Sequence, residues 1–302
     1  MENSGSLFLS RRFLPMFAAQ FLSALCDNLF RNGILVLVTF GLAEKAGYNG
    51  KIVTSIALGL FILPSFLFSA TAGALVDRFE KTRLVQILKS VEFFLMLIAG
   101  FALVEENVSF MLAMLFLLGT QAAFFGPVKY SILPQLVGKD ELVAANGYVE
   151  GGTFLAILIG TISGGLLIIA PHGTVIIAGL MASFTFTGWM ISFAIPRVGT
   201  GDPNLRLTWR ILSAAVPLLK NAAANRPVRR SILGISWFWF VGAVFLSVMP
   251  NYVKDVLHGD PWLVNFLLTL FSVGIGVGSV WCSRLLHGRI DARFVPLGGI
   301  LI

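Results

Sequence analysis

The sequence has 302 residues, of which 57% are hydrophobic and only 12% are charged. Soluble domains carry about 25% charged residues, so this composition excludes an ordinary soluble domain and indicates an integral membrane protein. The formal net charge of +7 does not indicate a nucleic-acid-binding protein, because the basic residues lie in short loops between apolar segments. Anionic lipid headgroups are the simpler partner for such loops.

Eight apolar segments are long enough to cross a bilayer as helices, since about 20 residues suffice. They cover residues 13–40, 52–76, 84–104, 108–133, 146–169, 174–195, 231–256 and 262–286. A ninth segment opens near Ala292 and stops at Ile302, about half the length that a crossing needs. We therefore expect the sequence to be a fragment that ends within a membrane span.

The first segment carries Asp27, Asn28 and Arg31 in its middle. A carboxylate at the centre of a membrane helix costs roughly 2.5–3.5 kcal/mol, so it should face a protein interior or a wet cavity. Asp27 and Arg31 are four residues apart and share a helix face, whereas we expect Asn28 on a different face from Arg31. These residues form a candidate substrate-binding site. The alternative is that Asp27 and Arg31 neutralise each other and only hold the bundle together.

The loop charges predict the orientation and the domains. Lys and Arg gather in the loops on the side of the N-terminus, which predicts a cytoplasmic N-terminus. Residues 1–196 are expected to form a six-helix bundle, 197–230 a cytoplasmic linker, and 231–302 the first two to three helices of a second bundle. Apolar residues within 205–219 recur at steps of three and four, which predicts an amphipathic helix on the membrane surface, with an unstructured linker as the alternative. Two parallel six-helix halves are typical of major facilitator transporters.

The loop between the second and third segments has a glycine, an Asp-Arg pair and a basic cluster: Gly73, Asp77, Arg78, Lys81 and Arg83. This pattern resembles the cytoplasmic signature of the major facilitator superfamily. Gly73 is expected to let neighbouring helices approach closely. Asp77 is expected to cap a helix or pair with a basic residue, so that Asp77, Arg78 and Arg83 latch the cytoplasmic side shut. Plain positive-inside topology explains the basic residues but not the Gly and Asp at this spacing.

The fourth segment contains the most distinctive string, residues 124–134. Pro127 after a glycine predicts a kink there. Lys129 lies at a similar depth to Glu150 of the fifth segment, so we expect either an ion pair between them or a lysine that snorkels to the interface. Gln121 is a further candidate for hydrogen bonding to the cargo, although Gln also joins membrane helices to one another.

Several strings together are similar to the bacterial lysophospholipid transporter family: Phe-Gly-Pro-x-Lys-Tyr-x-x-Leu-Pro at 125–134, Ala-Gln-Phe at 19–21 and Asp-Asn-Leu-Phe at 27–30. Residues 288–291 and 295–298 resemble versions fused to acyltransferase and acyl-carrier-protein synthetase domains. The resemblance implies a multi-pass flippase of the bacterial inner membrane. It would return lysophospholipid, chiefly lysophosphatidylethanolamine, to the cytoplasmic leaflet for reacylation by an acyltransferase. The acidic residue of the first helix would be Asp27.

The residue chemistry fits that cargo, because its head carries an ammonium and a phosphate that Asp27 and Arg31 complement. No Gly-rich phosphate loop and no nucleophile–base set is present in the sequence, so we expect a transporter without cofactor or metal rather than an enzyme. Two alternatives stay open. One is a proton-coupled drug or small-solute exporter of the same fold, and the other is the membrane module of a fused acyltransferase.

Overall fold

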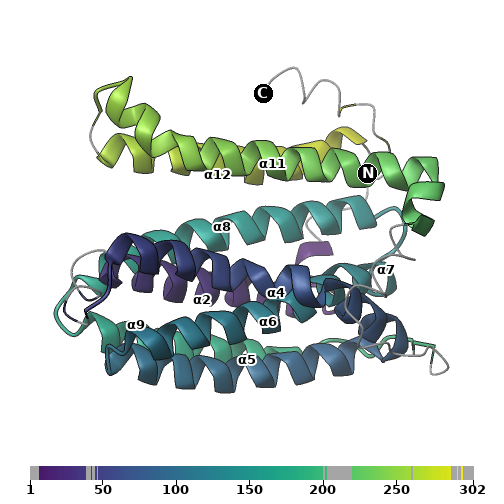
Figure 1. Ribbon diagram of the computed structural model, residues 1–302. Helices are drawn as coiled ribbons and strands as arrows, with labels where there is room; N and C mark the ends of the chain where they lie inside the picture. The colour runs from purple at the N-terminus through teal and green to yellow at the C-terminus, as the bar shows by residue number, and fades with distance from the viewer. Residues whose placement is uncertain are drawn as a thin grey trace. The chain divides into compact units, whose positions relative to one another are not determined.

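The computed structural model describes residues 7–38, 42, 45, 47–199, 201–202, 220–259, 261–286, 291 and 294. All regular structure in these residues is helical, which confirms the predicted all-helical fold (Figure 1). The helices are α2 (Leu14–Leu37), α4 (Gly50–Arg78), α5 (Lys81–Val104), α6 (Val108–Ser131), α7 (Leu133–Leu136), α8 (Leu142–Ile168), α9 (Gly173–Ser192), α11 (Arg226–Asp255) and α12 (Pro261–Leu286). Each of the eight predicted spans coincides with one of them. The predicted amphipathic helix at 205–219 and the ninth span lie outside the described residues.

Capping side chains define where α5 and α6 begin. The Glu80 carboxylate accepts hydrogen bonds from the first backbone N–H groups of α5, so α5 begins at Lys81 and not at residue 84. The side chain of Asn107 accepts the N–H of Phe110 at 3.0 Å at the start of α6. Such caps satisfy backbone donors that a helix start otherwise leaves unpaired. The cap at Glu80 therefore starts α5 before its apolar run, whereas α6 begins at Val108, where its run begins.

The chain is divided into two compact units. One consists of residues 1–207 and 276–302, and the other of residues 208–275. In the first unit α2 packs on α8 and α9, α4 packs on α6, and α5 packs on α6 and α9. The same set of pairs results when α2 is exchanged with α6, α4 with α8, and α5 with α9. The six helices are therefore two structural repeats of three. In the second unit the rings of Phe245 on α11 and Phe271 on α12 stack with centroids 5.1 Å apart.

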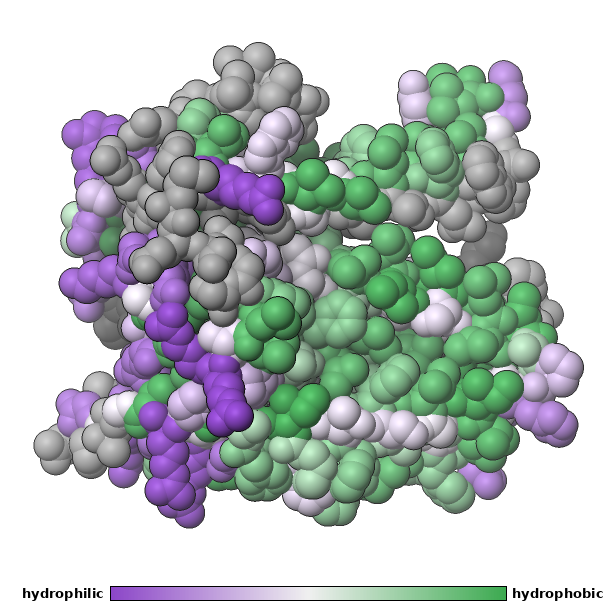
Figure 2. Space-filling model, turned by 180° about the vertical axis from the view of Figure 1, so that it is seen from behind, coloured by the Kyte–Doolittle hydropathy of each residue, from purple (hydrophilic) through white to green (hydrophobic). Residues whose placement is uncertain are grey.

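The surface of the first unit is apolar and its interior holds polar groups. Among the described residues, five helices are long and apolar enough to cross a membrane, namely α4 from Ile52 onward, α5, α6, α8 and α9. Large apolar side chains such as Phe66 and Leu166 are exposed on them. The face shown in Figure 2 has a broad hydrophobic area, with most hydrophilic side chains gathered at one end. On α2, by contrast, the polar residues Gln20 and Asn28 are buried inside the unit. This is expected, because polar residues avoid lipid.

Candidate functional site

Asp27 lies on α2 inside this bundle. Its Oδ1 atom is buried and has no hydrogen-bond partner among the described residues. Four charged side chains lie within electrostatic range of it: Glu92, Lys89, Arg31 and Lys129. An unsatisfied buried acceptor costs about 1–3 kcal/mol. A carboxylate kept in that state is a candidate for binding a cation or a hydrogen-bond donor.

Arg31 is held by groups other than Asp27. Its Nη2 donates to Oδ1 of Asn28, and its guanidinium lies over the ring of Phe61 on α4, 5.1 Å from the centroid. Asn28 in turn donates from Nδ2 to the carbonyl oxygen of Ala24 at 2.7 Å. The expectation that Asn28 faces away from Arg31 is wrong, because residues three apart on a helix are neighbours. Asp27 and Arg31 do not form an ion pair.

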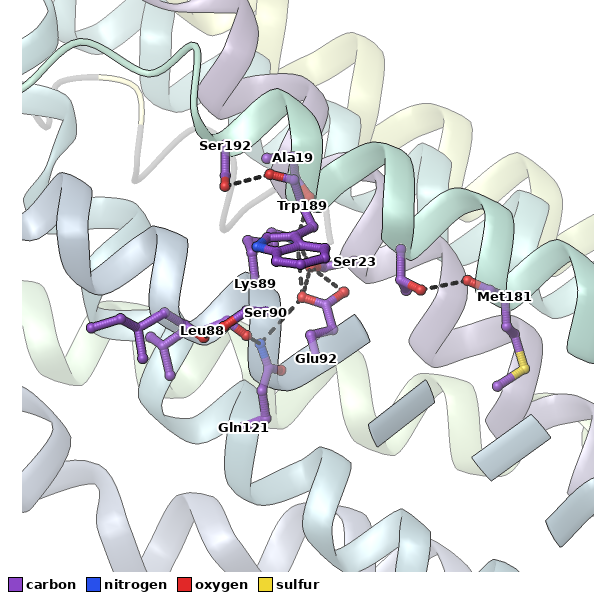
Figure 3. Close-up of polar contacts among 12 residues, drawn as sticks. Ala19, Ser23, Leu88, Lys89, Ser90, Glu92, Gln121, Met181, Trp189 and Ser192 are labelled. Carbon is purple, nitrogen blue, oxygen red and sulfur yellow. Dashed lines mark hydrogen bonds and ion pairs between the residues drawn. The ribbon is translucent and has the colours of Figure 1, made fainter. Parts of the chain in front are cut away.

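A buried polar cluster joins α2, α5 and α6 (Figure 3). Its charged members, Lys89 and Glu92, lie within electrostatic range of Asp27. Nζ of Lys89 donates to Oε2 of Glu92 at 3.0 Å, to the carbonyl oxygen of Ala19 at 2.6 Å, and to the hydroxyl of Ser23. That hydroxyl also donates to the Glu92 carboxylate at 2.7 Å. Lys89 and Glu92 are each 1% exposed. Their charges are therefore compensated within the protein.

Gln121 belongs to the same cluster. Its Nε2 donates to Oε2 of Glu92 at 3.2 Å and to the carbonyl oxygen of Leu88 at 3.3 Å. Both bonds join α6 to α5. The amide nitrogen of this predicted cargo ligand is thus already engaged in holding two helices together.

The predicted pair of Lys129 and Glu150 is not formed. Within the described part of the chain, the ion pairs are Arg12–Glu141 and Lys89–Glu92. Glu150 instead accepts a hydrogen bond from the hydroxyl of Tyr130.

Lys129 is oriented toward two other helices. Its Nζ donates to Oγ1 of Thr153 on α8 at 3.4 Å, and Thr153 bonds to the side chain of Gln20 on α2 at 3.0 Å. The helix that carries Lys129 continues through Pro127 to Ser131.

The cytoplasmic signature loop departs from the sequence expectation at two residues. A Cβ atom on Gly73 would meet nothing within 4 Å, so Gly73 does not provide a close helix approach in this unit. The cap of α5 is Glu80 and not Asp77. Asp77 is exposed at the end of α4, where its carbonyl oxygen accepts the N–H of Asp202 at 2.9 Å.

Glu80 also binds the start of the linker. Its carboxylate accepts the N–H groups of Thr82, Arg83 and Val198, at 3.0, 2.9 and 3.3 Å. Partial burial raises the pKa of Glu80, but these hydrogen bonds outweigh it, and the pKa lies below its ordinary value. The sequence does not predict this role of Glu80, because the usual N-cap residues are Ser, Thr, Asp and Asn.

No group of three or more metal-ligating side chains occurs in the part of the chain that the structure describes.

Comparison with known proteins gives one family. The family model of the Major Facilitator Superfamily matches residues 16–302. A lysophospholipid transporter LplT of Salmonella heidelberg is 29% identical over 305 residues, which cover 97% of this chain and 70% of that protein. The LplT of Salmonella paratyphi B is 28% identical with the same coverage.

A solved structure shares the fold. The crystal structure of a peptide transporter POT in complex with sulfate has a TM-score of 0.51 and 18% sequence identity. The match covers 78% of this chain and 52% of that one, so the chain spans about half the length of the peptide transporter. The predicted major facilitator fold is confirmed by this likeness and by the family match.

Proposed function

The chain belongs to the major facilitator superfamily, and we propose that it moves a lysophospholipid, such as lysophosphatidylethanolamine, to the cytoplasmic leaflet of a bacterial inner membrane. It is a multi-pass membrane transporter and not an enzyme. The names of the LplT relatives support the class of cargo. The proposal places the N-terminus in the cytoplasm, because basic residues gather in the loops on that side.

The observation that carries the proposal is the unpartnered Oδ1 of Asp27. An ammonium group donates hydrogen bonds and brings a positive charge, so it satisfies this oxygen. The guanidinium of Arg31, one turn along α2, offers a charge for the phosphate of the same head. The acyl chain would stay against apolar helix surfaces while the head crosses.

Alternating access supplies the movement in this proposal. The two halves of a major facilitator protein rock around a central site. Asp77 and Arg78 end α4 on the cytoplasmic side, and we propose that they act with Gly73 and Arg83 as the latch of that side. The exposed Asp77 carboxylate supports this role, since a latch must make and break its contacts.

The test is uptake of labelled lysophosphatidylethanolamine by spheroplasts that carry the full-length protein. Asp27→Asn keeps the size of the side chain and removes its charge, so uptake should fall at least tenfold, because a charged hydrogen bond contributes about 1.5–3 kcal/mol. Asp140→Asn, in an exposed loop, is the matched control and should transport normally. Unchanged uptake by Asp27→Asn would rule out the role given to Asp27. Uptake that stops when the proton gradient is dissipated would favour proton coupling at Asp27 instead.

A further inference from the structure

Lys129 is a cation within a membrane-spanning helix, and its close neighbours are not carboxylates. Nζ lies 3.4 Å from Oγ1 of Thr153 and 4.8 Å from the centroid of the Tyr130 ring. No carboxylate of the described residues lies within ion-pair distance of its Nζ. The charges of Glu150, which accepts a hydrogen bond from Tyr130, and of Asp27 act on Lys129 only from a longer distance. A charge at this position requires an anion or water beside it.

The direction of the side chain distinguishes Lys129 from a lysine that snorkels to the membrane surface. A snorkelling lysine extends its ammonium into the headgroup region. Lys129 instead binds Thr153 on α8, and Thr153 binds Gln20, a residue of α2 that is 1% exposed. The ammonium is therefore oriented toward the interior, where three helices meet.

This interior position lies on the same side of α2 as Asp27. Gln20 and Asp27 are seven residues apart, which places them on one helix face about 10 Å apart along the axis. Lys129 lies within electrostatic range of Asp27, as it also does of Glu150. Arg31 lies one turn from Asp27 in the opposite direction. Two cations thus flank one carboxylate, with Lys129 toward the N-terminal end of α2 and Arg31 toward its C-terminal end.

We infer that Lys129 binds the phosphate of the cargo on the N-terminal side of Asp27, with Thr153 holding its ammonium in place. The inference rests on the proposed function. A lysine ammonium has three donors, and the bond to Thr153 uses one of them, so two are available for phosphate oxygens. Arg31 is more constrained, because Asn28 and Phe61 hold its guanidinium. The phosphate would then have a second binding position, closer to the cytoplasmic side than Arg31.

The test compares three lipids that share one acyl chain. Lysophosphatidylethanolamine carries an ammonium and a phosphate, lysophosphatidylglycerol carries only the phosphate, and monoacylglycerol carries neither. Their dissociation constants are measured on the purified full-length protein, as the unaltered chain, as Lys129→Gln, and as Lys139→Gln. Lys139 lies in an exposed loop and is the matched control.

Lys129→Gln should raise the dissociation constants of both phosphate lipids about tenfold to a hundredfold, the effect of losing a charged hydrogen bond. The same variant should change the dissociation constant of monoacylglycerol by no more than about twofold. Equal weakening of all three lipids would show that Lys129 supports the fold, and unchanged binding would show that it does not contact phosphate. Either result overturns the inference.

Two further measurements complete the design. If Lys129→Gln does not fold, the same binding measurements are made with Thr153→Val. This variant replaces the hydroxyl that binds Nζ of Lys129. It should weaken the phosphate lipids alone, and no change would overturn the inference. If the unaltered protein binds monoacylglycerol as tightly as both phosphate lipids, the proposed function itself is wrong, whatever the variants do.

Discussion

A Cβ atom on Gly164 of α8 would lie 2.5 Å from the carbonyl oxygen of Leu29 on α2. One turn earlier, a Cβ atom on Gly160 would collide with the carbonyl oxygen of Leu25. Small residues at every fourth position allow two membrane helices to pack backbone against backbone. This contact fixes α2 against α8, and with it the position of Asp27 between Leu25 and Leu29.

Gly164→Ala should therefore loosen the contact of α2 with α8. Overpacking at a tight site costs about 1–3 kcal/mol, so we expect a lower melting temperature in detergent. Gly179→Ala on α9 is the control, because a Cβ atom there meets nothing within 4 Å. Equal melting temperatures for the two variants would mean that α2 and α8 tolerate a wider separation.

The sequence predicts helix existence well and helix packing poorly. All eight predicted spans are helices, since an apolar run of about 20 residues is a strong signal. Small residues at 152, 156, 160 and 164 also form a readable pattern. The loop signature instead predicts a close approach at Gly73, where the structure has open space. A loop signature does not encode interhelical distance, whereas a repeat of small residues along one face does.

Pairing across helices was the least predictable feature of the site. Depth in the membrane suggested Lys129 and Glu150 as partners, yet Glu150 binds Tyr130. Depth follows from sequence position, but the rotation of each helix about its axis depends on the packing of the whole bundle. The contact of Ser23 with Lys89 and Glu92 had no sequence signal for the same reason.

The buried cluster on α5 should be sensitive to the loss of one charge. Removing one partner of a buried ion pair costs about 3–5 kcal/mol, because it leaves the other charge uncompensated. Lys89→Met and Glu92→Gln should each lower the melting temperature strongly, while the double variant should recover part of the loss. Thermal unfolding in detergent of the unaltered protein, the two single variants and the double variant measures the coupling between Lys89 and Glu92. Additive effects in this cycle would contradict the direct pairing of Lys89 with Glu92.

Glu80 should make stability depend on pH. Its pKa in the folded protein is below the ordinary value of 4.5, so its contribution is present above that pH. The contribution is lost as the pH falls from 4.5 through the lower folded value. The melting-temperature difference between the unaltered protein and Glu80→Gln should therefore be largest at neutral pH and shrink in acid. Loss of a cap costs about 1 kcal/mol, and a difference that grows on acidification would contradict this role.

Arg31 should not be replaceable by lysine, even though the charge is kept. Its planar guanidinium covers the Phe61 ring and donates to Asn28 at the same time, and a lysine ammonium lacks that shape. Arg31→Lys should lower lysophosphatidylethanolamine uptake by spheroplasts about tenfold, the combined effect of a lost cation–π contact and a misplaced charged hydrogen bond. Phe61→Leu should lower it less, because the bond to Asn28 remains. Full uptake by Arg31→Lys would mean that the site needs only a positive charge there, and that the contacts with Asn28 and Phe61 serve packing alone.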